Sequence, residues 1–216
     1  MAPVPQDVGV WREEYMATYV PNTIANLKPG DHVCWFFETQ EEHHAVITPF
    51  MRRGLEQEEK VLYIAHEHTP ESILGHLLDD GFDPEPYLAS GQLCFFTPDE
   101  TYVQSGAFDP DRMLARLHNE MDRAIAEGYI ALRATGEMSW AQKGVAGAYR
   151  LPEYEAKLNE FLLGNRCLLM CQYHQRCFAN EETLKQLSGS RNASAKSSEL
   201  SSITRSRDPT QTTLLP

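Results

Sequence analysis

The chain has 216 residues, of which 42% are hydrophobic and 23% charged, and this composition excludes a fully disordered or a fibrous protein. Its formal net charge of −12 repels phosphate backbones and anionic lipids, so we expect neither direct nucleic-acid binding nor membrane binding. No apolar run reaches the roughly 20 residues that cross a bilayer, and no signal-peptide pattern opens the chain. The five cysteines are an odd number in mostly apolar surroundings, which favours reduced thiols and a cytoplasmic protein.

Short apolar segments alternate with amphipathic ones along the central part of the chain. Segments rich in aromatic and β-branched residues predict buried strands at His32–Phe37, Lys60–Ala65, Leu93–Thr97, Tyr129–Thr135 and Cys167–Tyr173. Apolar residues at helical spacing predict helices over Asp111–Glu127 and Pro152–Leu163, and Thr69 before Pro70 predicts a further helix start. This alternation predicts an α/β fold, with a mostly parallel sheet of about five core strands and helices on both faces.

The two ends of the chain depart from this pattern. Residues 1–26 contain a short aromatic stretch, which we expect to form an N-terminal arm packed on the domain. Residues 188–216 are rich in Ser and Thr without periodic apolar positions, so we expect a disordered tail. The domain itself is predicted to span residues 27–187.

The loops that follow the predicted strands are where a ligand of such a sheet is expected to bind. The first of them, Glu38–His44, has three carboxylates but neither glycine nor lysine. A phosphate-binding loop needs glycines, so that its N–H groups approach the phosphates, and a lysine that neutralises them. We therefore expect no classical ATP hydrolysis.

The histidines and cysteines form no closed set of metal ligands in the sequence. Cys167 and Cys171 would lie about 13 Å apart on one strand, too far for a single tetrahedral ion. His32 and Cys34 share one strand face, about 6.6 Å apart, and would need partners from other strands to form a site. The chain also lacks the G-x-S-x-G motif of a serine nucleophile. We predict no metal, no cofactor and no catalytic residue.

Glu137 and Trp140, directly after a predicted strand, are the leading candidates for a ligand or signalling surface. Arg133 lies on the strand face that leads to Glu137, and we predict that it holds this carboxylate ionised; the alternative is an internal ion pair. Trp140, Tyr173 and Trp35 are predicted to line a pocket for a small, mostly apolar molecule, with ordinary core packing as the alternative. The candidate ligand-binding residues are His32, Cys34, Trp35, His66, Arg133, Glu137, Trp140, Tyr173 and His174.

Several motifs in order along the chain point to a known family. They are Leu27–Cys34, Phe50-x3-Gly54-Leu55, Lys60–Ala65, Tyr87–Leu93, Thr101-Tyr102 with Gly106-x-Phe108-Asp109-Pro110, Leu132–Trp140, Tyr154-Glu155 and Cys171-Gln172-Tyr173. This series resembles the MEDS domain, the methanogen/methylotroph, DcmR-type sensory domain, over about residues 27–187. The resemblance implies a core similar to that of RecA and KaiC ATPases without the phosphate loop. It also implies that the domain senses small, often hydrocarbon-like ligands and acts together with kinases or transcription regulators.

Three functions follow from these observations. The leading hypothesis is a non-enzymatic sensory domain that binds a small ligand and acts through a signalling partner protein, because no output domain fits in the remaining residues. The second is an enzyme of unrecognised chemistry that uses Glu137 with His66 or His174 as acid and base. The third is a protein-interaction regulator without a ligand. Whether the chain forms a homo-oligomer is left open.

Overall fold

The computed structural model describes residues 23–178 of the chain. Within this range the strands are β1 (His32–Phe37), β2 (Lys60–Ile64), β3 (Leu93–Phe96), β4 (Leu132–Glu137) and β5 (Cys167–His174). The α-helices are α2 (Gln40–Glu56), α3 (Pro70–Asp79), α4 (Glu85–Ser90), α5 (Pro110–Ala126) and α6 (Leu151–Leu162), and two short 3-10 helices, η1 (Ser139–Gln142) and η2 (Ala148–Arg150), lie between β4 and α6.

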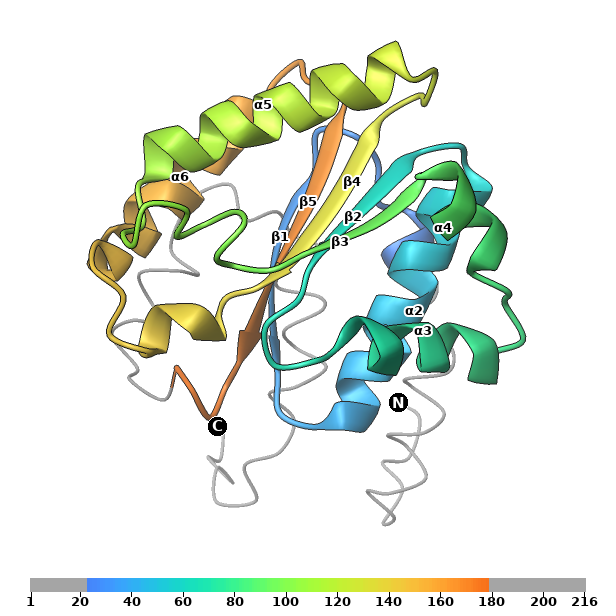
Figure 1. Ribbon diagram of the computed structural model, residues 1–216, viewed down its shortest axis with the longest axis horizontal. Helices are drawn as coiled ribbons and strands as arrows, with labels where there is room; N and C mark the ends of the chain where they lie inside the picture. Colours follow the sequence, from blue (N-terminus) through green and yellow to red (C-terminus); the bar gives the residue numbers. More distant parts are fainter. Residues whose placement is uncertain (1–22, 179–216) are drawn as a thin grey trace, which may run out of the picture.

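The five strands form one sheet in the order β1-β5-β4-β2-β3, and every neighbouring pair is parallel. Helices α5 and α6 cover one face of the sheet, whereas α2, α3 and α4 lie on the other (Figure 1). The predicted α/β fold with helices on both faces is thereby confirmed.

Alternation along each strand divides the core into two layers. On β1, Val33, Trp35 and Phe37 pack toward α2 and α3, whereas Cys34 and Phe36 pack toward α5 and α6. All six residues of β1 are buried, as expected of a strand in a parallel sheet that is covered on both faces. Residues two apart therefore share a layer, and this parity decides which predicted site residues meet.

One predicted strand is displaced. The sequence places the fourth strand at Tyr129–Thr135, but β4 begins at Leu132 and continues to Glu137. Gly128, with φ of +98°, ends helix α5, and the N–H of Tyr129 donates back to the carbonyl of Ala124. The residues after Gly128 thus belong to the turn, and Glu137 is the last residue of the strand rather than part of a loop.

The other predicted elements agree closely with the structure. Helices α5 and α6 each begin and end one residue earlier than expected, and α3 begins at Pro70 with Thr69 as its N-cap. The predicted N-terminal arm lies almost entirely outside the described residues, and the predicted tail lies wholly outside them. No helix between residues 23 and 178 is long and apolar enough to cross a bilayer.

Candidate functional site

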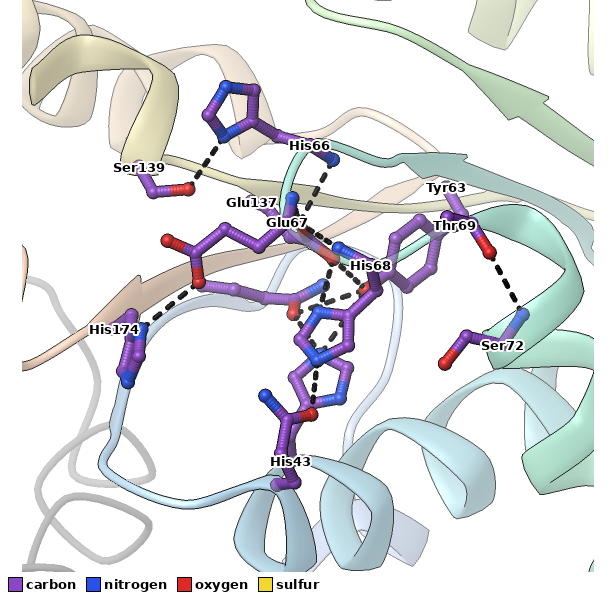
Figure 2. Close-up of polar contacts among 12 residues, drawn as sticks. His43, Tyr63, His66, Glu67, His68, Thr69, Ser72, Glu137, Ser139 and His174 are labelled. Atoms are coloured by element: carbon purple, nitrogen blue, oxygen red, sulfur yellow. Dashed lines mark hydrogen bonds and ion pairs between the residues drawn. The ribbon is translucent and has the colours of Figure 1, made fainter. Parts of the chain in front are cut away.

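Polar side chains gather at the carboxyl ends of β2, β4 and β5, beside the first turn of α2 (Figure 2). Parallel register brings these ends to one edge of the sheet, where Glu137 of β4 pairs with Gln172 of β5. Tyr63 of β2, His68 from the loop after β2, and His43 of α2 complete the group. We call these five residues the Glu137 site.

Both carboxylate oxygens of the buried Glu137 accept hydrogen bonds. Oε1 accepts from the Tyr63 hydroxyl at 2.6 Å and lies 2.8 Å from Nδ1 of His68. Oε2 accepts from three consecutive backbone N–H groups, those of His66 at 2.9 Å, His68 at 3.1 Å and Glu67. Burial favours the neutral acid, but hydrogen bonds from His68 and Tyr63 outweigh it and lower the pKa of Glu137 to about 2. The site therefore holds a fixed carboxylate anion.

A chain of hydrogen bonds sets the tautomer of His43. Gln172 donates from Nε2 to Oγ1 of Thr135 at 2.8 Å, and this hydroxyl donates to the carbonyl of Met170 at 2.9 Å. Oε1 of Gln172 is therefore an acceptor, and it lies 2.8 Å from Nε2 of His43, which donates to it. Burial, followed by the nearby His68, lowers the pKa of His43 to about 3, so the ring is neutral. Its buried Nδ1 then has no proton and has no partner in the described part of the chain.

The side chains of His66 and His174 lie at the margin of this edge. Nδ1 of His66 is 2.8 Å from Oγ of Ser139 and points away from the Glu137 site (Figure 2). Nδ1 of His174 is 3.0 Å from the Glu67 carboxylate, which also accepts from the Cys177 thiol at 3.3 Å. The histidine ring that contacts Glu137 is that of His68. The structure therefore does not pair the Glu137 carboxylate with the ring of His66 or His174, as the second functional hypothesis predicted.

The loop between β1 and α2 is closed by a side chain of its own helix. The Glu42 carboxylate accepts the N–H groups of Glu38 at 2.8 Å and Thr39 at 3.3 Å. In return, the Thr39 hydroxyl accepts the N–H of Glu42 at 3.3 Å, which completes a capping box. In a phosphate-binding loop such N–H groups are turned toward the phosphate. Here an internal carboxylate occupies two of them.

The predicted pairing of Arg133 with Glu137 is wrong. Arg133 stands near the start of β4, and its guanidinium donates to the carboxylate of Glu59 and, at 3.3 Å, to the carbonyl of Phe50. Gly54 of α2 leaves the space for this arrangement, because a Cβ there would lie 2.6 Å from Cδ of Arg133. Arg133 and Glu137 do share a strand face, but four residues of strand separate them by about 13 Å.

The predicted pocket of Trp140, Tyr173 and Trp35 does not form, because the sheet separates its members. Trp35 packs on the α2 face, stacked on Phe37 with ring centroids 5.1 Å apart. Trp140 and Tyr173 pack in the layer of α5 and α6. His32 and Cys34 share one face as predicted, and both are buried on the α6 side of the sheet, where Cys34 contacts Glu155.

A small cavity does lie on the α5/α6 face of the sheet, beneath an aromatic cluster. Its wall includes Ile64, Tyr102, Leu117, Ala134, Tyr154 and Cys171. Trp140 stacks on Tyr102, with ring centroids 4.9 Å apart, and its buried Nε1 finds no acceptor among residues 23–178. The cavity is therefore mostly apolar, with phenol groups from two tyrosines in its wall.

Sequence reasoning missed four of the five residues in the Glu137 site, namely His43, Tyr63, His68 and Gln172. His68 stands in a loop after a predicted strand, so its position carried a usable signal. The other three lie within a helix or a strand, where polar residues are indistinguishable from solvated or core positions until the register is known.

Comparison with known proteins assigns the chain to a family. The family model described as MEDS, MEthanogen/methylotroph, DcmR Sensory domain, matches residues 31–189, and the chain belongs to this family. No curated protein matches the chain.

Two solved structures are similar to this chain. The flagellar accessory protein FlaH from Methanocaldococcus jannaschii has 12% sequence identity and a TM-score of 0.58, with 79% of this chain and 73% of FlaH covered. A KaiC-like protein from Pyrococcus horikoshii OT3 has 18% identity and a TM-score of 0.46, with 68% of this chain covered. The chain spans 62% of the length of that KaiC-like protein. The similarity to FlaH shows a shared fold, which agrees with the RecA/KaiC-like core that the sequence resemblance implies.

Proposed function

We propose that this domain is a non-enzymatic sensory module, which binds a small and mostly apolar molecule and acts through a signalling partner protein. Membership of the MEDS family indicates a sensory role. The ligand, the partner and the absence of catalysis are the parts that we propose, and the following contacts support them.

The observation that carries the proposal is the Glu42 capping box. The N–H groups of Glu38 and Thr39 already have a carboxylate partner, and the loop offers no lysine in its place. A nucleotide phosphate would have to displace a bound anion of the same sign, with no lysine or arginine in residues 38–44 to offset its charge. This arrangement favours a RecA-like core that does not use nucleotides.

The state of Glu137 argues against general-base catalysis. Its carboxylate accepts five hydrogen bonds, and its pKa of about 2 makes it a weak base at neutral pH. A catalytic base is expected to have a pKa near the working pH and a lone pair available to the substrate. Glu137 instead ties the end of β4 to the loop after β2, as an internal brace does.

The cavity lined by Tyr102 and Tyr154 is the place that we propose for the ligand. Its accessible volume of about 10 Å³ is that of a single water molecule, so a molecule of few heavy atoms enters only when the apolar wall moves apart. The hydroxyls of Tyr102 and Tyr154 then offer one polar contact. This position differs from the predicted rim surface, and Trp140 adjoins it through Tyr102, on which it stacks.

Thermal melts of the full chain test the proposal with a panel of short-chain alcohols, amines and halogenated hydrocarbons. A ligand at 100 times its Kd adds about 2.7 kcal/mol of stability, which is readily visible as a raised melting temperature. Ala134→Val, which fills the cavity, should abolish the shift, and Ala115→Val on the exposed side of α5 should leave it unchanged.

Leu117→Ala provides a second variant in the same cavity wall. It should lower the melting temperature of the free protein by removing buried apolar contacts, while the ligand shift persists or grows because the cavity is larger. A ligand shift that Ala134→Val leaves intact would place the ligand elsewhere. A panel without any shift in the wild-type chain would contradict ligand sensing at this cavity.

A further inference from the structure

We propose that His32, Cys34, Glu155 and Cys171 form a binding site for a thiophilic divalent metal ion of the zinc type. We call these four residues the His32 cluster. It lies on the α5/α6 side of the sheet, whereas the Glu137 site lies on the α2 side. The inference does not depend on the proposed ligand.

The topology brings these ligands together from three elements. His32 and Cys34 are two residues apart on β1, and Cys171 of β5 is the direct register partner of Cys34. Glu155 reaches the same point from α6. The spacing along β1 alone does not complete a site, because the third and fourth ligands are more than 120 residues away in the chain.

The ligand atoms of His32, Cys34 and Glu155 all lie within 4.8 Å of one another, close to the edges of a tetrahedral site, and Cys171 is the proposed fourth ligand because it contacts His32. Zn–N bonds of about 2.0–2.1 Å and Zn–S bonds of about 2.3 Å imply edges of roughly 3.3–3.8 Å between ligand atoms. Nε2 of His32 lies 3.1 Å from Oε2 of Glu155, 3.7 Å from Sγ of Cys171 and 3.9 Å from Sγ of Cys34. The contacts of Glu155 with Cys34, at 2.9 Å, and with His32, at 3.1 Å, are shorter than these edges and must lengthen when an ion enters.

The surrounding contacts orient the ligands as they do in metal sites. Asn159 donates from Nδ2 to the carbonyl of Glu155 at 3.2 Å, so its Oδ1 is left to accept from Nδ1 of His32 at 2.9 Å. Nε2 of His32 therefore faces the two thiols and the carboxylate. The Tyr173 hydroxyl donates to the second oxygen of Glu155. A histidine whose far nitrogen is hydrogen-bonded, next to a hydrogen-bonded carboxylate, is the usual second sphere of a bound metal.

Burial makes an ion a reasonable partner for this group. Glu155, Cys34 and Cys171 are 0%, 1% and 4% exposed, and a carboxylate in such a place needs a compensating charge, which the free chain supplies when Nε2 of His32, 3.1 Å away, is protonated. A divalent cation would replace this proton on His32 and would convert the thiols to the thiolates that bind it. Cys171 also lines the small cavity beside Tyr102 and Tyr154.

Titration of the full chain with Co²⁺ alone, after treatment with a chelator, tests the proposal. We expect one equivalent to bind, with a thiolate-to-cobalt charge-transfer band and the intense visible bands of tetrahedral cobalt. Zn²⁺ should then bleach this spectrum by displacing Co²⁺. Cys34→Ser should weaken Co²⁺ binding at least tenfold, and Cys171→Ala, tested in parallel because a buried hydroxyl can destabilise the fold, should do the same.

Two further thiols serve as matched controls. Cys94→Ser removes a half-buried thiol on β3, away from the cluster, and should leave the titration unchanged. Cys177→Ser tests the competing group of Glu67, His174 and Cys177 at the edge of the sheet. The proposal fails if the folded wild-type chain gives no thiolate band. It also fails if the band survives Cys34→Ser and Cys171→Ala but is lost in Cys177→Ser.

Discussion

Arg133 and Glu137 lie on the same face of β4, yet their side chains belong to opposite ends of the strand and to separate networks. Arg133 joins β4 to Glu59, directly before β2, and Glu137 joins the end of β4 to the loop directly after β2. Two polar networks thus tie the same pair of strands together at both ends. Because both networks are buried, removing either one should measurably lower the free energy of unfolding.

Glu137→Gln should lower the free energy of unfolding by about 1–3 kcal/mol, the cost of leaving buried partners unsatisfied. The glutamine amide turns donors toward groups that are themselves donors, either Tyr63 and His68 or the backbone N–H groups. Urea denaturation measures the change, with Glu153→Gln at the solvent-exposed side of α6 as the control, where we expect at most about 1 kcal/mol. Equal stability of Glu137→Gln and wild type would show that the carboxylate is not a brace.

Arg133→Met should cost more, about 3–5 kcal/mol, because it leaves the Glu59 carboxylate buried without its partner. Adding Glu59→Gln in the double variant should recover part of this loss, since no charge is then stranded. Arg52→Met breaks the exposed pair with Glu56 and should change stability by about 1 kcal/mol or less. A double variant no more stable than Arg133→Met would contradict the interpretation of a stranded charge.

Acid should destabilise the fold through His43. Its pKa is about 3 in the folded chain and about 6.5 when unfolded, so the unfolded chain binds more protons between these values. The contribution of neutral His43 to the free energy of unfolding is complete above pH 6.5. It falls as the pH drops below this value, by up to about 1.4 kcal/mol per pH unit. Glu137, with a lowered pKa of about 2, adds a second loss below pH 4.5.

Urea midpoints between pH 7 and pH 4.5 test this in wild type, His43→Gln and the exposed-site control His118→Gln. The groups that face His43 and contribute to its titration are His68, Glu137 and His76. His43→Gln should flatten the decline, and His118→Gln should follow the wild type. A wild-type slope that persists in His43→Gln would assign the acid sensitivity to another group.

Trp140→Phe should remove most of any ligand-induced change in tryptophan fluorescence. Trp140 stacks on Tyr102 in the wall of the proposed ligand cavity, whereas Trp35 lies across the sheet. Trp35→Phe is therefore the matched control and should keep the ligand response. If the response instead follows Trp35, the ligand lies on the α2 face.

The five strands and the helices α3, α5 and α6 could be predicted from local pattern, because each buried strand is a short apolar run and α5 and α6 each have one apolar face, whereas α2 and α4 were not predicted. Thr69 with Pro70 marked the start of α3 for a purely local reason. The partner of Glu137 could not be found in this way. The order of the strands places His68 next to Glu137. Arg133 lies on the same strand face as Glu137, but it stands at the other end of β4, where it pairs with Glu59. Only the register of the sheet distinguishes these outcomes.

The clustering of His32 and Cys34 with Glu155 was equally out of reach of the sequence. The two β1 residues share a face, as strand alternation predicts. The sequence pattern does not indicate, however, that Glu155 of α6 and Cys171 of β5 contact them. Glu155 falls on the buried side of α6, where a carboxylate is unexpected from amphipathic spacing alone.

Calorimetric titration of the full chain with ATP and GTP in the presence of Mg²⁺ tests the central claim most directly. The claim is that this RecA-like core senses a ligand and does not bind nucleotides, because the Glu42 carboxylate occupies the N–H groups of the loop between β1 and α2. We expect no binding at millimolar nucleotide, from a chain whose melting curve shows it to be folded. Micromolar binding of either nucleotide to the loop at Glu38–His44 would contradict the claim.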